Sequence, residues 1–321
     1  MNESTDYSPA DPAPIPVSLT IPAECAGLRL DQALARLFPE HSRSRLQGWL
    51  RAGFILLDGT PDDAKRKVWG GETLQVCQPP LPEETANAAE DIPLAVLFED
   101  PHILVIDKPA GLVVHPGSGN WSGTLLNALL HHAPELAHVP RAGIVHRLDK
   151  ETSGLMVVAR TLEAQTDLVR QLQSRSVGRH YLALVHGACP ESGTVDAPIG
   201  RHPTQRTRMA IVSSGKPAVT HYRAHTRYAA CTLVECRLET GRTHQIRVHM
   251  ASLGHPLVGD PTYGARHKAA GALGAFQRQA LHAYRLRLRH PADGREMEWT
   301  SPIPQDFAQL LAALPPQGAT Q

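Results

Sequence analysis

A helical spacing of apolar residues marks the first folded segment of the chain. Apolar side chains recur three or four positions apart over residues 28–38 and stop at a proline, which predicts a short helix. A second helix is predicted over 42–53, because a serine can cap its start and a glycine its end. Two strand-like runs follow, 54–57 and 73–76, the first leading into an Asp-Gly turn. Residues 21–78 therefore predict a small α/β domain.

Beyond residue 93 the pattern changes to short β-rich runs that do not alternate strictly with helices. Strands are predicted at 95–98, 103–106, 143–145, 155–159, 181–185, 232–236 and 245–249, and helices near 123–132, 162–174 and 305–313. This order is typical of an α+β fold with a mixed, largely antiparallel central sheet. We expect that fold over residues 93–314.

Changes of composition set the remaining domain limits. Residues 1–20 are rich in Pro, Ser and Asp without periodicity, and we expect a disordered tail there. Residues 79–92 are rich in Pro and Glu and predict a linker. Residues 315–321 are expected to form a short C-terminal tail.

Charge is distributed unevenly along the chain. The whole chain has a formal charge of +1, but residues 101–321 hold 24 Lys and Arg against 15 Asp and Glu, a net +9. The segments 1–26 and 79–100 hold only acidic charges and mask this excess. A basic body is expected of a protein with a phosphate-rich partner.

Three further observations exclude classes of protein and of site. Five cysteines are an odd number without C-x-x-C spacing, which argues against a disulfide framework and a thiolate metal site. His244 and His249 are five positions apart and make a poor ligand pair, so we expect no metal site. Because no secretory leader and no run of eighteen apolar residues is present, we expect a cytoplasmic protein without membrane contact. We also expect a monomer.

The polar loop with the most chemical interest lies between two apolar runs. The stretch GIVHRLDKETSGLMVVAR, residues 143–160, places His146, Arg147 and Asp149 in this loop, and Gly154 lets the chain turn back. A carboxylate in a loop is most often a cap or a solvated surface group. The residues alone therefore leave the role of Asp149 open.

HRLDKETSGL closely resembles the catalytic motif of the RluA-type pseudouridine synthase family, in which the Asp of H-R-L-D is essential. Further family blocks match in the same order, among them LVVHPGSGN, RHYLALVHG, GKPAVTHY and LETGRTHQIRVHM. Residues 21–78 resemble the S4 RNA-binding module. The resemblance implies a pseudouridine synthase fold and an isomerisation of uridine that needs no metal or redox cofactor. The bond from uracil N1 to ribose C1′ is broken, the base turns, and it is rejoined through C5.

The resemblance also implies roles for three residues of the reaction centre. Asp149 either attacks C1′ or assists removal of the C2′ proton, and both roles remain open. Arg247 is the expected partner that keeps Asp149 ionised, because burial alone would raise the pKa of a carboxylate. Tyr181 matches the tyrosine that packs against the target base, with a part in proton transfer left open.

Other basic residues are expected to contact RNA. Arg147 resembles the arginine that enters the RNA stack when the uridine flips out, and Arg242 is expected at a phosphate. The remaining expected RNA contacts are His146, Arg43, Arg45, Lys65, Arg66 and Lys67. Arg43 and Arg45 lie in the first turn of a predicted helix, where backbone N–H groups favour a phosphate.

The substrate implied by the resemblance is 23S rRNA or a large-subunit precursor. Within the family, the S4-like module and the blocks together resemble subfamily D, which implies the helix-69 stem-loop as target. Subfamily C is the alternative and implies other sites on the same RNA. A glycosidase using Asp149 and Glu151 would also cleave a bond at C1′, but an RNA-binding module and a basic body do not fit its substrate. A non-catalytic RNA-binding assembly factor is the other alternative, and the set Asp149, Tyr181 and Arg247 argues against it.

Overall fold

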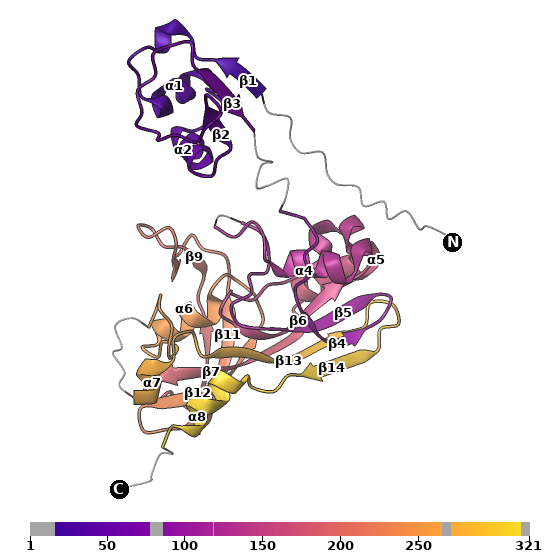
Figure 1. Cartoon of the computed structure of the whole chain (residues 1–321). Coiled ribbons are helices and arrows are strands. Elements are labelled where there is room, and N and C mark those ends of the chain that lie inside the picture. The colour runs from indigo at the N-terminus through magenta and orange to yellow at the C-terminus, as the bar shows by residue number, and fades with distance from the viewer. Residues whose placement is uncertain (1–16, 78–85, 118, 265–270, 316–321) are drawn as a thin grey trace, which may run out of the picture. The chain divides into compact units, whose positions relative to one another are not determined.

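The structure is a computed structural model that describes residues 17–77, 86–117, 119–264 and 271–315 (Figure 1). The chain divides into two compact units, residues 1–84 and 85–321. None of the helices in these described ranges has the length and apolar character needed to cross a membrane.

The first unit packs two helices against a three-stranded sheet. Its elements are β1 (Val17–Thr20), the 3-10 turn η1 (Ala23–Cys25), α1 (Leu30–Leu37), α2 (Arg43–Arg51), β2 (Ile55–Leu57) and β3 (Thr73–Val76). The strands are antiparallel in the order β1-β3-β2. Leu34 and Leu46 of the helices are buried with Leu74 of the sheet in one apolar cluster. The Ser42 side chain accepts a hydrogen bond from the backbone N–H of Arg45, so the helix start predicted there is confirmed.

Two of the predicted domain limits differ from the structure. The expected tail, 1–20, includes β1, which is held because its residues pair with the whole of β3; residues 1–16 lie outside the described ranges. The expected linker, 79–92, has its second half packed on the second unit. Asn127 donates hydrogen bonds to the carbonyl groups of Ala86 and Ala88 at 3.0 and 2.7 Å. Periodicity could not indicate this, because the contact is made by backbone groups.

The second unit is built on a mixed sheet. Its strands are β4 (Ala95–Glu99), β5 (Ile103–Lys108), β6 (Ser153–Ala159), β7 (Gly178–His186), β8 (Ser192–Asp196), β11 (Val219–Arg227), β12 (Cys231–Leu238), β13 (Leu281–Arg289) and β14 (Glu296–Thr300). The order is β4-β5-β6-β13-β7-β12-β11-β8, with β14 also paired to β13. In the described part of the sheet β6 and β13 run parallel and the other neighbours antiparallel. A separate ribbon joins β9 (Ile199–Arg201) and β10 (Met209–Ile211).

Helices cover both faces of this sheet, as the burial of β5 shows. Leu104 and Ile106 pack in one cluster with α4, whereas Ile103 and Val105 point to the other face and pack with α5. The helical elements are α4 (Leu125–His132), η2 (Pro134–His138), η3 (Pro140–Gly143), α5 (Leu162–Gln173), α6 (Gln245–Ser252), α7 (Gly271–Ala275) and α8 (Gln305–Ala312). The prediction of an α+β fold with a mixed, largely antiparallel sheet is confirmed.

Two predicted strands are wrong. The run 143–145 follows η3 and forms only an isolated bridge from Ile144 to Val158. Gly143 has φ of 73°, and a Cβ there would overlap the backbone of Ala159, so a close approach prevents a regular strand. The run 245–249 begins α6. Its side chains are all buried, and a short run buried on every side has no period that separates a strand from a helix.

Candidate active site

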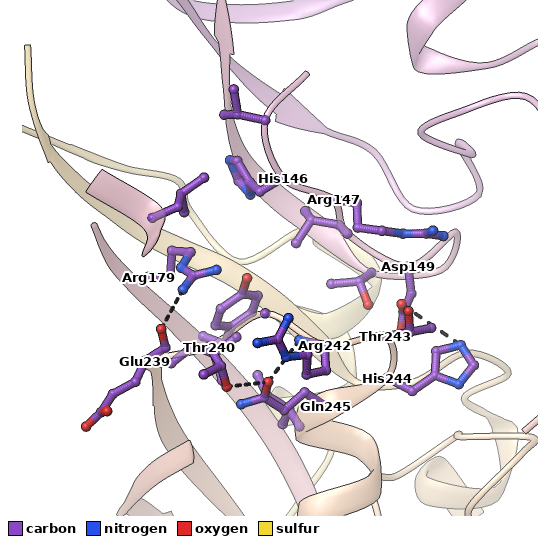
Figure 2. Close-up of a pocket in the computed structure, with 18 of the residues that line it drawn as sticks. His146, Arg147, Asp149, Arg179, Glu239, Thr240, Arg242, Thr243, His244 and Gln245 are labelled. Atoms are coloured by element: carbon purple, nitrogen blue, oxygen red, sulfur yellow. Dashed lines mark hydrogen bonds and ion pairs between the residues drawn. The ribbon is translucent and has the colours of Figure 1, made fainter. Parts of the chain in front are cut away.

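A pocket of about 600 Å³ opens beside the polar loop 146–152, the β7 strand and the start of α6 (Figure 2). Its lining brings together the predicted reaction-centre residues and three of the predicted RNA contacts, namely Asp149, Tyr181, Arg247, His146, Arg147 and Arg242. Six arginines and two carboxylates are among the described lining residues. The pocket is therefore suited to an anionic ligand.

Arg247 joins Asp149 to a second carboxylate deep in the site. Its Nη1 donates a hydrogen bond to Asp149 Oδ2 at 3.0 Å. Its Nε and Nη2 donate to the two oxygens of Asp260 at 2.7 and 3.0 Å. Asp260 is fully buried, whereas 16 % of the Asp149 side chain remains exposed. Asp260 thus holds the Nε and Nη2 atoms of the guanidinium, and Nη1 donates to the carboxylate that lines the pocket.

The charges in this cluster stabilise one another. Burial acts to lower the pKa of Arg247, but Asp260 and Asp149 together raise it above its ordinary value. Burial acts to raise the pKa of Asp260, yet the hydrogen bonds and charge of Arg247, with the N–H groups of Thr262 and Tyr263, hold it below its ordinary value. Arg247 and Asp260 are therefore both charged at neutral pH.

The loop that carries Asp149 is held by its backbone. The buried Lys108 ammonium donates to the carbonyl oxygens of Pro109, Leu112 and Lys150 at 2.7, 2.9 and 3.1 Å. Burial lowers the pKa of Lys108 to about 8. Arg278 donates to the carbonyl of Glu151 at 3.1 Å. These contacts fix the chain on the C-terminal side of Asp149.

His244 approaches the same carboxylate from the start of α6. It has a left-handed backbone with φ of 56°, and its Nε2 lies 4.0 Å from Asp149 Oδ1 (Figure 2). Its Nδ1 lies 2.9 Å from the hydroxyl of Tyr263, which accepts a hydrogen bond from the Met209 N–H. Burial lowers the pKa of His244 more than Asp149 raises it. The imidazole is therefore neutral at pH 7.

Tyr181 and Arg147 occupy different parts of the pocket. Tyr181 comes from β7 and is buried, and burial raises the pKa of its phenol, so the hydroxyl is protonated at neutral pH. Arg147 is exposed beside Asp149 on the loop (Figure 2).

The remaining predicted pocket residues have structural contacts. Arg242 Nε donates to the carbonyl of Pro217 at 3.1 Å, while the rest of its exposed guanidinium faces the pocket (Figure 2). His146 Nε2 accepts a hydrogen bond from the Val157 N–H at 3.0 Å, and burial lowers its pKa to about 3. This hydrogen bond anchors the loop to β6, and the RNA contact expected of His146 stays a prediction.

In the first unit the five predicted RNA contacts are all exposed, and two of them pair with carboxylates. Arg43 donates to the buried carboxylate of Asp31 at 2.8 and 3.1 Å, so it serves the fold of the unit. Arg66 pairs with Asp62. Arg45, Lys65 and Lys67 are exposed as well.

Sequence reasoning missed several residues of the site. Asp260 and Tyr263 lie in the run GDPTYG, residues 259–264, but nothing local shows that their side chains turn toward Arg247. Lys108 could have been found, because a lysine that ends an apolar strand and precedes Pro-Ala-Gly needs a buried partner. Arg179, which lines the pocket from β7, gave no signal apart from its distance of two residues from Tyr181.

Comparisons with known proteins agree with this geometry. The RNA pseudouridylate synthase family matches residues 102–252. Ribosomal large subunit pseudouridine synthase D of Nitrosomonas europaea is 60% identical over 93% of this chain and 88% of its own length. The protein of the same name from Pseudomonas aeruginosa is 56% identical over 92% and 94%.

Solved structures show the same fold. Human RNA Pseudouridylate Synthase Domain Containing 1 superposes with a TM-score of 0.54 at 30% identity, covering 76% of this chain and 93% of its own. Human RNA Pseudouridylate Synthase Domain Containing 4 gives 0.53 at 27% identity, covering 68% and 92%. The matched segment 102–252 contains Asp149, Tyr181 and Arg247. This chain belongs to the RluA-type family of pseudouridine synthases.

Proposed function

We propose that this protein isomerises uridines of 23S rRNA to pseudouridine, with the helix-69 stem-loop as its target. The relatives from Nitrosomonas and Pseudomonas carry a name that specifies the large ribosomal subunit. The single observation that carries the proposal is the ion pair between Arg247 and Asp149 at 3.0 Å in a pocket rich in arginine. The pair presents a largely buried carboxylate, held by an arginine, to an anionic polymer.

The geometry supports a role for Asp149 at the ribose. Arg247 occupies Oδ2, and Oδ1 faces His244 at 4.0 Å. An incoming ribose can therefore meet a carboxylate oriented on one side by an arginine. Both open roles, attack at C1′ and removal of the C2′ proton, need this charged form. Packing against the base is assigned to Tyr181, whose buried hydroxyl is protonated at neutral pH.

We further propose that residues 17–77 form an S4-like RNA-binding module and that the protein acts in the cytoplasm as a monomer. Two helices followed by antiparallel strands and the exposed cations Arg45, Lys65 and Lys67 support the module. Phosphate contacts supply most of the sequence-independent affinity for RNA, so this unit would add binding strength to the pocket of the second unit.

The test of the reaction uses variants of the loop carboxylates. Asp149→Asn keeps the shape of the side chain and removes its charge, so we expect loss of tritium release from [5-³H]uridine-labelled 23S rRNA with folding and RNA affinity retained. The matched control is Glu151→Gln, two positions along the same loop, which should stay within about threefold of wild type. Undiminished activity of Asp149→Asn would refute the assignment. Equal loss in both variants, with free uracil released by wild type, would favour a glycosidase.

The target is tested separately. Pseudouridines mapped in rRNA from a strain lacking this gene should be missing from helix 69. If pseudouridines were missing only from other large-subunit positions, the proposed target would be refuted and the proposed reaction would stand.

A further inference from the structure

Arg179 is a buried cation with no carboxylate partner among the residues that the structure describes. It is 6% exposed and lines the pocket from β7. Its Nη2 donates to the backbone carbonyl of Glu239 at 3.1 Å (Figure 2), while its buried Nε has no hydrogen-bond partner among the described residues. The Glu239 carboxylate is occupied elsewhere, because it pairs with Arg175 at 2.6 Å and His221 at 2.7 Å.

A buried charge of this kind is costly until an anion or a strong acceptor arrives. Removing a guanidinium from water without a compensating partner destabilises the folded protein, and burial lowers the pKa of Arg179 accordingly. The other pocket arginines differ. Arg247 has two carboxylates, and Arg147 and Arg242 are exposed to water. Arg179 therefore has N–H groups without an acceptor in the described part of the chain, and these favour binding of a ligand group that brings acceptor atoms into the pocket.

The position of Arg179 points to the base of the substrate. Arg179 and Tyr181 are two residues apart on β7, so their side chains share one face of the strand. The charges of both Arg179 and Asp149 act on the Tyr181 hydroxyl, which lies within electrostatic reach of each. Figure 2 shows Arg179 and Asp149 on opposite sides of the pocket, with Arg242 between them. A uracil ring packed on Tyr181 would have its ribose toward Asp149 and its far side toward Arg179.

We propose that Arg179 is a further catalytic residue, whose guanidinium donates hydrogen bonds to the carbonyl oxygens of the target uracil and stabilises the negative charge of the detached ring. This inference rests on the uridine isomerisation proposed above. The exposed Arg242 keeps its expected contact with a phosphate of the RNA, and Arg147 its expected place in the RNA stack.

The electron balance of the reaction explains why a cation is needed there. When the N1–C1′ bond breaks, its electron pair stays on N1, and the ring carries one negative charge shared among N1, O2, O4 and C5. This holds whether Asp149 forms a bond to C1′ or removes the C2′ proton. C5 then forms the new bond to C1′, Asp149 is released or returns its proton, and the proton on C5 is replaced by one on N1. No outside reactant is consumed.

Gly241 lies close to the guanidinium of Arg179, so a substitution of this glycine can move the guanidinium without removing it. A Cβ on Gly241 would lie 2.7 Å from Arg179 Nη1. Gly241 has no left-handed backbone that alanine would strain, and the end of an arginine side chain can shift to make room. Gly241→Ala should therefore displace the cation by a few tenths of an ångström while keeping its charge.

The experiment measures single-turnover conversion at saturating 23S rRNA transcript, together with the Kd for the same RNA. Arg179→Met should slow conversion by about 100-fold, the loss seen when one donor to a developing anion is removed. Arg179→Lys should recover part of the rate because it restores the charge, and Gly241→Ala should lose about tenfold. The Kd should change by less than about threefold in each case. Arg237→Met, an exposed arginine on the neighbouring β12, is the matched control and should stay within about twofold.

A transcript with 5-fluorouridine separates charge stabilisation from positioning. On this RNA the rate measured is the disappearance of N1-linked 5-fluorouridine, because C5 carries fluorine in place of the proton whose loss completes pseudouridine. Fluorine withdraws electrons and stabilises the negative charge of the detached ring, so the rate deficit of Arg179→Met should become smaller. A weakened Kd with an unchanged rate would mean a phosphate contact and would overturn the proposal, as would a deficit equally large on both RNAs. If Arg179→Met does not fold, Gly241→Ala and Arg179→Lys decide: wild-type rates in both overturn the role. An inactive wild type would instead refute the proposed function itself.

Discussion

Arg247 serves two carboxylates of different exposure, and this division determines how the site is held. The fully buried Asp260 accepts hydrogen bonds from Nε and Nη2, whereas Asp149 accepts from Nη1 alone. Asp260 also accepts from the N–H groups of Thr262 and Tyr263. The orientation of the guanidinium is therefore set by Asp260, and Asp149 stays accessible to a substrate without losing its partner.

Asp260→Asn should destabilise the protein and slow the reaction. Removing one member of a buried ion pair leaves the other charge uncompensated, so we expect the free energy of unfolding in urea to fall by about 3 kcal/mol. Because folding holds the pKa of Asp260 below 3.8, its contribution is present above that pH and is lost as pH falls through its lower folded value. The difference in the free energy of unfolding between wild type and Asp260→Asn should therefore become smaller in acid. Asp293→Asn, half exposed, is the control and should change stability by less than about 1 kcal/mol.

The residues of the site differ in how far the sequence could predict them. Asp149 and Arg247 lie 98 positions apart, and only the family blocks, read together, indicated that they meet. The positions of Asp260 and His244 in the site follow from the course of the chain around α6. The first residues of this helix, 245–249, were predicted as a strand. A contact made through a left-handed residue such as His244 has no periodic signature.

Elements with a clear helical period were predicted well, and those fixed by close packing were not. The predicted helices near 123–132, 162–174 and 305–313 correspond to α4, α5 and α8, because each has one buried and one exposed face or a capping residue. Gly154 was expected at a turn but lies within β6. Its place is set by contact with a strand more than a hundred residues away, which no local pattern can show.

Gly154→Ala should therefore disrupt the centre of the sheet. Gly154 has φ of 117°, and a Cβ there would overlap the backbone of Ala283 on β13, its parallel neighbour. Backbone cannot move as a flexible side chain can, so we expect a loss of more than about 2 kcal/mol in the free energy of unfolding. Thermal melting by circular dichroism would measure it. Gly48→Ala, in open space within α2, should instead be neutral or stabilising by up to about 1 kcal/mol; similar destabilisation in both variants would contradict the packing argument.

At the scale of the whole molecule, positive charge is divided between the two units. The region 101–321 carries a net +9, and its pocket holds six described arginines. In the first unit, Arg43 pairs with Asp31 and Arg66 with Asp62. The remaining predicted contacts, Arg45, Lys65 and Lys67, are exposed. If the first unit is an RNA-binding module, these three cations should add affinity without entering the chemistry.

Replacing Arg45, Lys65 and Lys67 together with glutamine tests this division. Each lost phosphate contact should lower the slope of log K against log salt by about 0.7 to 0.9, so the triple variant should bind 23S rRNA more weakly with a slope smaller by about 2 to 3. Its single-turnover rate at saturating RNA should match wild type, because the pocket is intact. The control Arg36→Gln with Arg51→Gln removes exposed charges from the last turns of α1 and α2, away from the predicted phosphate site. If the control lost as much slope per charge, net charge rather than a defined surface would explain the binding, and the S4-like interpretation would lose its main support.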